Sequence, residues 1–502
     1  MIKPKPANAR LPIAAFLLLF ISSLLFFAVH WYVNTYGQLG FDAVLYTLLS
    51  DMSGVQAGLV ISFLKSGLLP TVLVSIILTA FLFYRGSDAL FVTLFGKLRL
   101  KLFPLSRVVR RFLFLLIPAF MITNAVVNVQ LPEYIYYLNN LSTVYEDEYA
   151  DPDEVTITFP QEKRNLIYIF LESMETTYFS TREGGALPHN LIPNLYALAD
   201  NNTNFSHNDS VGGFFSAPGT EWTIGAMVGQ TAGVSLKTPP GLGGNDYGKE
   251  DNFLPGLTTL TDILHRNGYY QCLMVGSDAS FGGRRTYFSQ HGIDRIYDYH
   301  TAIKDGIIPQ DYYVWWGMED AYLFEYAKRE LTALASRPQP FNFTMLTVDT
   351  HHVDGYLCQY CGSEYAEQYD NVIRCSDRQV SEFVSWITQQ DFYPNTTVVI
   401  VGDHRSMDGA YFERNAPDFD RRIYNCILNA PIQAVQEKNR QFVTMDLFPT
   451  TLAALGCTIE NDRLGLGTNL FSGKPTLAEQ YGLDRLNQLL QGSSSYYFDH
   501  FY

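Results

Sequence analysis

The chain is short of basic residues. Lysine and arginine together number 35 against 50 aspartates and glutamates, so the formal net charge at pH 7 is −15. Proteins that bind nucleic acid neutralise its phosphates with a basic surface. The charge balance therefore argues against nucleic acid as a partner.

Cysteines are few, and their spacing is not that of a zinc finger. Cys358 and Cys361 form a C-x-x-C pair, but no second such pair and no histidine pair of finger spacing follows. Cys375 lies close by, and an oxidising compartment permits one disulfide among the three. We favour a bond from Cys375 to either Cys358 or Cys361. The other cysteines lie in apolar segments and are expected to be buried thiols: Cys272, Cys426 and Cys457.

Polar sequence is scarce in the first 130 residues, where three apolar runs occur at 11–33, 68–84 and 112–129. The length of the first run and the lack of a good small-residue cleavage site before Trp31 argue against a cleaved signal peptide. The second run contains Pro70 and the third Pro118. We expect residues 1–130 to form a transmembrane domain of about three helices.

Positive charges flank these runs unevenly. Only Lys65 lies between the first and second runs. Basic residues instead gather before the first run and between the second and third: Lys3, Lys5, Arg10, Arg85, Lys97, Arg99, Lys101, Arg107, Arg110 and Arg111. The positive-inside rule places both groups in the cytoplasm. With three spans, the chain after about Gln130 then lies outside, in a periplasm or at a cell surface.

The rest of the chain divides in two. Residues 131–160 are rich in tyrosine, asparagine and acids, and we expect a juxtamembrane helix and linker there. Residues 161–502 alternate short apolar runs with segments of helical spacing, which predicts an extracytoplasmic α/β domain with a mixed, mostly parallel doubly wound sheet. The expected strands are 166–171, 270–275, 341–348, 396–401 and 423–428, and the clearest expected helices are 256–267, 320–336 and 370–389.

Two of these strands end in residues that can bind a metal ion. Asp403 and His404 follow the apolar run that begins at Val398, and Glu172 follows the strand that ends at Leu171. Ligands of open α/β sheets bind beyond the carboxyl ends of the strands. Carboxylate oxygen and imidazole nitrogen both suit a divalent metal. Taken alone, a loop Asp-His pair is more often structural, and a lone glutamate there is more often a helix cap.

A hydroxyl group comes next along the chain. Gly219 and Thr220 precede an apolar run that begins at Ile224, which indicates a helix beginning near Thr220. An ordinary threonine cap is one interpretation. The other is a nucleophile, because the start of a helix favours bound phosphate and a metal lowers the pKa of a hydroxyl group.

Two further loops carry polar residues. His351 and His352 follow the strand that ends at 348, and adjacent histidines point in different directions, so at most one is expected to face the site. Asp278, Arg284 and Arg285 follow the strand that ends at 275. Guanidinium groups suit a phosphodiester, although a pair of surface arginines is an equally good interpretation. We expect all of these residues to lie at the same edge of the sheet.

The order of these motifs resembles a known family. Leu-Glu-Ser at 171–173, Gly-Thr-Glu at 219–221, Asp-Thr-His-His-x-Asp-Gly-Tyr at 349–356, Gly-Asp-His at 402–404 and Thr-Met-Asp-Leu-Phe-Pro-Thr at 444–450 resemble the membrane-anchored phosphoglycerol transferases. That group belongs to the sulfatase and alkaline phosphatase superfamily. It includes lipoteichoic acid synthases and transferases that decorate periplasmic glucans. The resemblance covers about residues 160–475.

The resemblance implies a site and a reaction. Glu172, Thr220, Asp403 and His404 would hold one divalent metal ion, Mn²⁺ first and Mg²⁺ or Zn²⁺ as alternatives, with Thr220 as nucleophile. His351 or His352, with Arg284 or Arg285, would bind the phosphoglycerol group, and His351 would act as acid and base. Phosphatidylglycerol would be the donor and a glycan the acceptor. The protein would lie in the bacterial inner membrane.

Two departures from the superfamily narrow the reaction. Sulfatases need C/S-x-P-x-R, whereas residues 216–220 have threonine in place of the arginine, which argues against sulfatase activity. Lipoteichoic acid synthases generally have five spans, and three fit the glucan-type transferases better. The alternatives are a phosphoethanolamine transferase acting on lipid A or a glycan, a phosphodiesterase or sulfatase, and a non-catalytic membrane sensor or scaffold.

Overall fold

The computed structural model describes residues 10–37, 41, 44–45, 57–83, 91–94, 98–101, 106–238 and 252–502. These residues form two compact units. The first contains the N-terminal helices as far as Glu133. The second contains Tyr134–Tyr502 and so makes up most of the chain. Each unit is described separately.

The first unit contains three helices that are long and apolar enough to cross a membrane: Ile13–Tyr36, Gly58–Leu82 and Val108–Asn128. The second begins earlier than the expected residue 68, because a π-helical turn joins two α-helices into one continuous element. Lys65, expected in a loop, therefore lies within helical structure. The elements of this unit are α1 (Arg10–Tyr36), α3 (Ala57–Phe63), η1 (Leu64–Leu68), α4 (Leu69–Phe83), β1 (Phe91–Leu94), β2 (Leu98–Lys101) and α5 (Arg107–Asn128).

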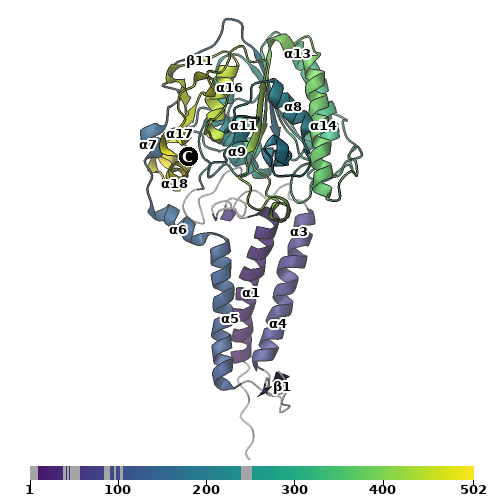
Figure 1. The fold of residues 1–502 in the computed structure, drawn as a ribbon, viewed down its shortest axis with the longest axis vertical. Coiled ribbons are helices and arrows are strands. Elements are labelled where there is room, and N and C mark those ends of the chain that lie inside the picture. The colour runs from purple at the N-terminus through teal and green to yellow at the C-terminus, as the bar shows by residue number, and fades with distance from the viewer. Residues whose placement is uncertain are drawn as a thin grey trace, which may run out of the picture. The chain divides into compact units, whose positions relative to one another are not determined.

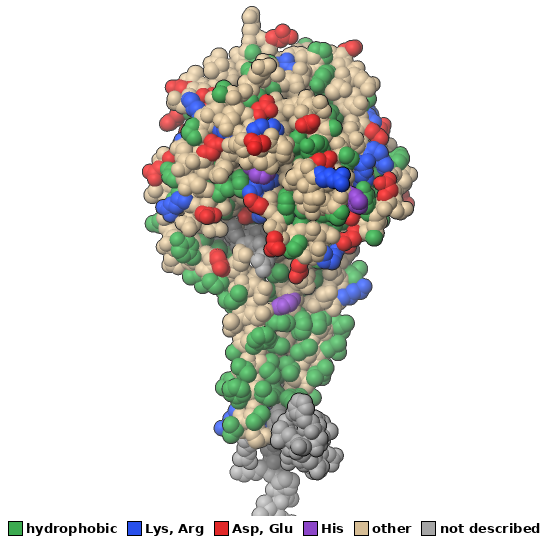
Figure 2. Space-filling view, in the orientation of Figure 1, with side chains coloured by type: hydrophobic (Ala, Val, Ile, Leu, Met, Phe, Trp, Pro, Cys, Tyr) green, Lys and Arg blue, Asp and Glu red, His purple; other side chains and the backbone are tan. Residues whose placement is uncertain are grey.

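The surfaces of the two units differ in kind. Hydrophobic side chains cover most of the visible face of the helical unit, whereas charged side chains of both signs are scattered over the visible face of the second unit (Figure 2). Several large aliphatic side chains of α1 and α4 are at least half exposed: Ile13, Leu17, Ile21, Leu69, Leu73, Ile76 and Ile77. Such a contiguous apolar surface suits a lipid environment.

The second unit is built on a seven-stranded sheet in the order β5-β10-β9-β4-β8-β6-β7. The five strands from β9 to β7 are mutually parallel, and β10 is antiparallel to both β9 and β5. The predicted mixed, mostly parallel sheet is therefore confirmed. Its strands are β4 (Asn165–Leu171), β5 (Gly213–Phe214), β6 (Tyr270–Val275), β7 (Arg295–Tyr297), β8 (Phe341–Leu346), β9 (Thr396–Gly402) and β10 (Ile423–Leu428).

Helices cover both faces of this sheet (Figure 1). Along β4, Leu166, Tyr168 and Phe170 enter one hydrophobic core, while Ile167 and Ile169 enter the other. The alternation follows from the period of two in a strand, and both sets are apolar because both faces are covered. The first core holds α9 (Thr223–Ala232), α10 (Leu260–Arg266), α11 (Arg284–Gln290) and α16 (Leu447–Ala454), and the second holds α8 (Pro193–Asn201), α13 (Asp320–Ala335), α14 (Gln368–Thr388) and α15 (Gly409–Asn415).

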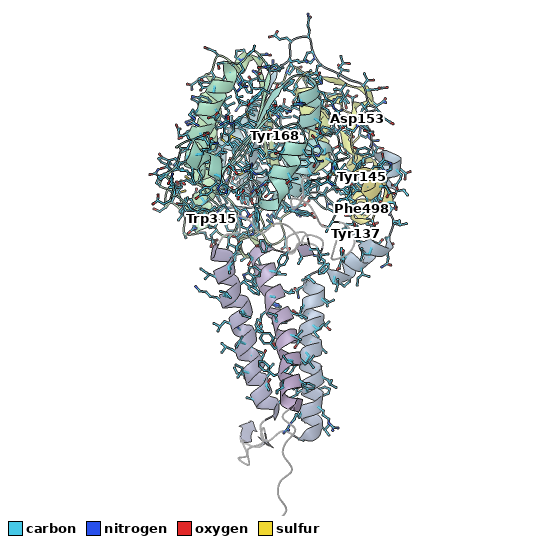
Figure 3. The ribbon with its side chains drawn as sticks, turned by 180° about the vertical axis from the view of Figure 1, so that it is seen from behind. Tyr137, Tyr145, Asp153, Tyr168, Trp315 and Phe498 are labelled. Atoms are coloured by element: carbon cyan, nitrogen blue, oxygen red, sulfur yellow. The ribbon has the colours of Figure 1, made fainter. Side chains whose placement is uncertain are left out.

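The segment expected to be a juxtamembrane helix and linker contains α6 (Leu131–Asn139), α7 (Val144–Glu148) and β3 (Ile157–Thr158). Tyr145 of α7 is fully buried, and its ring centroid lies 5.4 Å from that of Tyr497. Tyr145 and Phe498 lie on the same side of the unit (Figure 3). From α7 onward, this segment therefore contributes to the hydrophobic core of the second unit.

Replacing Ile400 by alanine is expected to destabilise the second unit by about 2–5 kcal/mol, because the Ile400 side chain is fully buried in β9, an interior strand of the sheet. The apparent Tm of the full chain in detergent measures the effect. Val435→Ala is the control, since Val435 is 76% exposed, and we expect it to change stability by less than about 0.5 kcal/mol. Equal losses for the two variants would contradict this packing.

Candidate active site and metal centre

The register of two neighbouring strands brings the predicted metal ligands together. Strands β4 and β9 pair in parallel, with Leu171 opposite Gly402. The residues that follow, Glu172 and Asp403, must then leave the same edge of the sheet side by side. The Ser173 N–H group fixes this arrangement by donating a hydrogen bond of 2.8 Å to Asp403 Oδ1.

Glu172, Asp403 and His404 form a compact buried cluster. His404 Nε2 lies 3.3 Å from Asp403 Oδ2 and 3.6 Å from Glu172 Oε1. One potential ligand atom of each residue lies within 4.8 Å of those of the other two. All three side chains are excluded from solvent. Buried charges of this kind are paired or bind a metal.

Hydrogen bonds leave the metal-binding atoms of two residues facing inward. His404 Nδ1 lies 2.8 Å from the carbonyl oxygen of Arg405, which can only accept, so Nδ1 carries the proton and Nε2 keeps its lone pair. Asp403 Oδ1 accepts from the N–H groups of Ser173 and His404. The other oxygen, Asp403 Oδ2, is buried without a hydrogen-bond partner. A cation would satisfy it.

The charges of the cluster shift its pKa values in opposite directions. Burial and the charge of Glu172 raise the pKa of Asp403 to about 7. Burial also acts to raise the pKa of Glu172, but the charges of His351 and His404 outweigh it and lower that pKa overall. Burial acts to lower the pKa of His404, yet the neighbouring Asp403 and Glu172 raise it overall. Two adjacent carboxylates share one imidazole, so a second cation would stabilise their ionised forms.

The hydroxyl group beside this cluster belongs to Thr223, not to Thr220. Thr223 Oγ1 lies 3.4 Å from His404 Nε2 and 3.5 Å from Glu172 Oε2. Thr220 Oγ1 instead donates to the carbonyl of Ala217 at 2.7 Å and lies 2.9 Å from Thr444 Oγ1. The structure thus places Thr223, rather than the predicted Thr220, in contact with Glu172 and His404. The reason is that helix α9 begins at Thr223, after a tight turn that the Thr220 side chain stabilises.

Helix α9 is fixed to the end of β9, which holds Thr223 in place. Gln230 of α9 donates from Nε2 to the carbonyls of Gly402 and Asp403 at 3.1 and 3.3 Å. Tyr168 donates to Gln230 Oε1 at 2.8 Å, so both polar atoms of the buried Gln230 side chain have hydrogen-bond partners. Thr223 is the first residue of the helix, where the backbone N–H groups and the positive end of the dipole suit a phosphate.

The two histidines of the third loop lie against each other, with ring centroids 4.4 Å apart. His351 is half buried, and its ring lies 4.7 Å from that of Trp316. Its Nδ1 lies 2.8 Å from the carbonyl oxygen of His352 and therefore carries the proton, which leaves Nε2 as the acceptor. The charge of His351 helps to lower the pKa of Glu172, and the charge of His404 helps to lower the pKa of both histidines. Burial lowers the pKa of both histidines, which favours the neutral imidazole.

Of the two predicted arginines, Arg284 is the one whose charge acts on Glu172. Arg284 is buried, donates to Ser277 Oγ and to the carbonyls of Phe281 and Asp278, and its charge helps to lower the pKa of Glu172. Arg285 forms an ion pair with the buried Asp298. Asp278 interacts with His300 Nε2 at 3.0 Å and is not part of the cluster. Arg285 and Asp278 thus have local partners away from the predicted metal ligands.

Two residues of the site were not predicted. Thr223 directly precedes the apolar run that begins at Ile224, so a helix start placed three residues later would have selected it. Helix boundaries read from sequence are uncertain by that much. Trp316 lies in a loop without regular periodicity, and no sequence signal connects it to His351.

The family model described as Sulfatase matches residues 164–457, more than half of the chain. The chain belongs to the sulfatase family. Two relatives in this comparison, both named phosphoglycerol transferase I and found in Salmonella choleraesuis (strain SC-B67) and Salmonella typhi, are 31% identical over 342 residues. Each match covers 65% of this chain and 42% of the relative, so the chain spans less than half the length of the curated relatives it matches.

A solved structure shares the fold of this unit. A protein of the alkaline phosphatase superfamily from Vibrio parahaemolyticus matches with a TM-score of 0.50 and 21% identity, covering 66% of this chain and 76% of that one. This likeness concerns the fold. The candidate site of this sulfatase-family chain lies within the part that the family model matches.

A divalent metal fits the donor set of this sulfatase-family site. Two carboxylates, one imidazole with its lone pair directed inward and one hydroxyl converge, and Asp403 Oδ2 lacks any hydrogen-bond partner. Mixed oxygen and nitrogen donors suit Mn²⁺, Mg²⁺ or Zn²⁺. The residues that would hold the ion are Glu172, Thr223, Asp403 and His404.

We expect the full chain to bind one Mn²⁺ ion and Asp403→Asn to weaken that binding at least about 100-fold, since Asp403 supplies the oxygen without a partner. Binding should strengthen as the pH rises through about 7, because Asp403 must lose its proton to become a ligand. Titration calorimetry at several pH values measures both effects. The control is Asp278→Asn, and equal weakening by the two substitutions would place the metal elsewhere.

Proposed function

We propose that the protein is a metal-dependent phosphoglycerol transferase that takes its group from phosphatidylglycerol and passes it to a glycan. Support for the transferred group comes from the relatives named phosphoglycerol transferase I, whose similarity spans the candidate site. Support for the chemistry comes from one observation above all. Thr223 Oγ1 stands at the start of helix α9, within 3.5 Å of both Glu172 and His404.

In the proposed first step, Thr223 Oγ1 attacks the phosphorus of the lipid phosphodiester. The Oγ1–phosphorus bond forms, the bond from phosphorus to the diacylglycerol oxygen breaks, and a glycerophospho-threonine results. A divalent metal, when bound, lowers the pKa of the threonine hydroxyl and offsets the charge of the phosphoryl oxygens. The first-turn N–H groups of α9 face the same charge.

In the second step, an acceptor hydroxyl attacks the phosphorus and releases Thr223. We assign the proton transfers to His351, because its Nε2 is the free acceptor and its pKa is held low, which keeps the imidazole neutral between steps. In the first step it would take the proton of Thr223 Oγ1 and pass it to the departing diacylglycerol oxygen. In the second step it would take the acceptor proton and return it to Thr223 Oγ1. Arg284 would bind a phosphoryl oxygen, because its guanidinium lies in a buried position near Glu172.

Phosphoryl rather than sulfate transfer is favoured by the position of the helix start. Ser216, the serine that the formylglycine motif would use, precedes the turn, whereas α9 begins at Thr223. The motif also has threonine at 220 where sulfatases have arginine. We therefore propose that the unmodified Thr223 is the nucleophile.

We place the catalytic unit outside the cytoplasm of a bacterial inner membrane. The three apolar helices and the basic residues around them support this orientation through the positive-inside rule. A membrane anchor keeps such an enzyme near a lipid donor. A glycan acceptor on the same side needs no transport of the phosphoglycerol group.

Thr223→Ala is expected to abolish the covalent adduct and to slow transfer at least about 10³-fold, because it removes the nucleophile. Thr223→Ser should keep the adduct. Intact-protein mass spectrometry after incubation with phosphatidylglycerol measures the adduct. Thr220→Ala is the matched control: it removes a buried hydrogen-bonding hydroxyl and should cost about 1–3 kcal/mol of stability while leaving the adduct in place.

The opposite outcome, an adduct in Thr223→Ala and none in a folded Thr220→Ala, would return the nucleophile to Thr220. Measuring the apparent Tm of each variant separates loss of chemistry from loss of folding. An adduct that survives in both variants would contradict a threonine nucleophile in this turn.

The donor can be tested without knowing the acceptor. We expect full-length protein with Mn²⁺ to acquire label on the Thr223 peptide from phosphatidylglycerol labelled in its head-group glycerol, with release of diacylglycerol, since Thr223 holds the group between steps. A chelator should prevent labelling, and restored Mn²⁺ should recover it. Label from phosphatidylethanolamine labelled in ethanolamine would instead identify a phosphoethanolamine transferase.

A further inference from the structure

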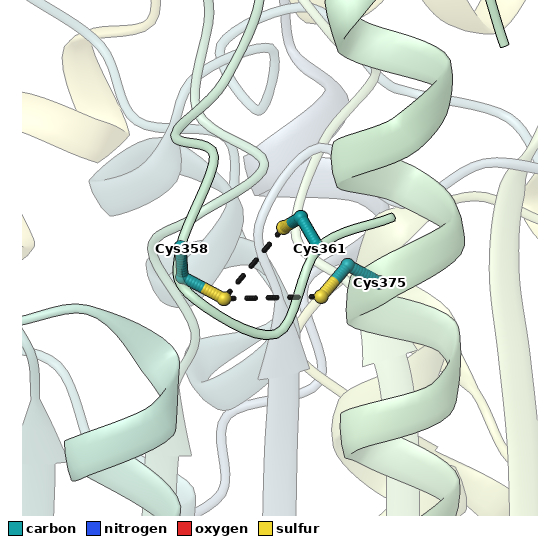
Figure 4. Close-up of side chains that lie close together, drawn as sticks. All are labelled: Cys358, Cys361 and Cys375. Carbon is teal, nitrogen blue, oxygen red and sulfur yellow. Dashed lines mark hydrogen bonds between the residues drawn. The ribbon is translucent and has the colours of Figure 1, made fainter. Parts of the chain in front are cut away.

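Three cysteines of the second unit lie together but take no part in the candidate metal centre. Cys358 and Cys361 belong to the loop between β8 and α14, and Cys375 belongs to α14. Cys358 Sγ lies 3.6 Å from Cys361 Sγ and 3.8 Å from Cys375 Sγ (Figure 4). All six cysteines of the chain are thiols in this structure. Cys358 Sγ is therefore in contact with the sulfur atoms of both Cys361 and Cys375.

The three thiols differ in exposure and in their surroundings. Cys358 and Cys375 are buried, whereas Cys361 is half exposed. Nitrogen donors approach the buried pair: Gln379 Nε2 lies 3.5 Å from Cys375 Sγ and 3.8 Å from Cys358 Sγ. Arg378 Nη2 lies 3.6 Å from Cys375 Sγ, and such donors stabilise a thiolate.

The other three cysteines of the chain have a different environment. Burial raises the pKa of each of these thiols to about 12: Cys272, Cys426 and Cys457. Hydrogen bonds from Cys361 and Cys375 instead lower the pKa of Cys358. Contact with Cys358 raises the pKa values of Cys361 and Cys375, so within the cluster Cys358 is the thiol that ionises most readily.

We propose that the cluster is a thiol–disulfide exchange site, in which the half-exposed Cys361 receives oxidising equivalents and the buried pair Cys358–Cys375 retains them as a disulfide. The oxidant is an external disulfide. The inference rests on the cysteine geometry and is independent of the proposed function.

The exchange proceeds in three displacements. The Cys361 thiolate attacks the external disulfide and releases one thiolate. The Cys358 thiolate then attacks the Cys361 sulfur, which releases the second external thiolate and forms Cys358–Cys361. The Cys375 thiolate finally attacks the Cys358 sulfur and displaces Cys361 as a thiolate. Two protein thiols are oxidised, the external disulfide gains two electrons, and the two protons lost from the protein are taken up by the departing thiolates.

A Cys358–Cys375 disulfide would hold the loop that carries the two histidines. The loop that carries His351 and His352 runs on to Cys358, and α14 already holds the start of this loop. Tyr369 donates to the carbonyl of Thr350 at 2.8 Å, and Gln368 donates to that of Gly355 at 3.0 Å. A bond from Cys358 to Cys375 would fix the far end of the loop to the same helix.

A structural zinc site is the competing interpretation, and the ligand set disfavours it. Such sites take four protein ligands. Within the part of the chain that the structure describes, the group contains three cysteines and no fourth histidine, cysteine or carboxylate. Three sulfurs thus suffice for one disulfide with a spare thiol, but they are one ligand short of a structural zinc site.

The test uses full-length protein in detergent, reduced, freed of metal and then exposed to oxidised glutathione. Peptide mapping without reduction should find Cys358–Cys375 with Cys361 free. Cys361→Ser should form the same bond at least about tenfold more slowly, and Cys375→Ser should stop at Cys358–Cys361. Cys272→Ser, the control, should behave as the unaltered protein.

Three results would overturn the proposal. The first is that, after oxidation, the disulfide includes Cys361 or no disulfide has formed. The second is a Cys361→Ser variant that oxidises at the unaltered rate. The third is reduced protein that binds one Zn²⁺ through all three thiols and resists oxidation. Thr223→Ala, carried in parallel, should oxidise normally, so failure of the transferase chemistry and failure of the exchange site remain distinguishable.

Discussion

The pairing of β4 with β9 is the constraint on which the site depends. Because Leu171 lies opposite Gly402, Glu172 and Asp403 emerge together, and His404 follows at once. Moving either strand by one residue would turn its side chains to the other face of the sheet, and both faces are packed with apolar side chains. Hydrophobic burial far from the chemistry therefore fixes the ligands in place. Helix α9 depends on the same edge, since Gln230 bonds to the carbonyls of Gly402 and Asp403.

The parts of this arrangement that could be predicted are those dictated by local sequence. Long β-branched runs such as 396–401 identify strands, and polar residues directly after them identify an edge of the sheet. Glu172, Asp403 and His404 could be predicted for that reason. Short edge strands such as β5 and β7 have too few residues to show a periodicity.

What could not be predicted depended on where a turn ends and on what a side chain meets in space. Thr220 and Thr223 both precede an apolar run, and only the structure shows that the turn uses the hydroxyl of Thr220 internally. Arg284 and Arg285 are adjacent, yet Arg285 pairs with Asp298, which another loop supplies. The sequence alone does not show which of two adjacent residues faces the site, because that depends on contacts with distant parts of the chain.

The site joins two independently packed cores. Thr223 is borne by α9, whose apolar face belongs to one core, while the loop of His351 is held by α14, whose apolar face belongs to the other. Damage to the first core would displace Thr223, and damage to the second would displace the loop of His351. Substitutions on opposite sides of one sheet can therefore shift Thr223 and the His351 loop independently of each other.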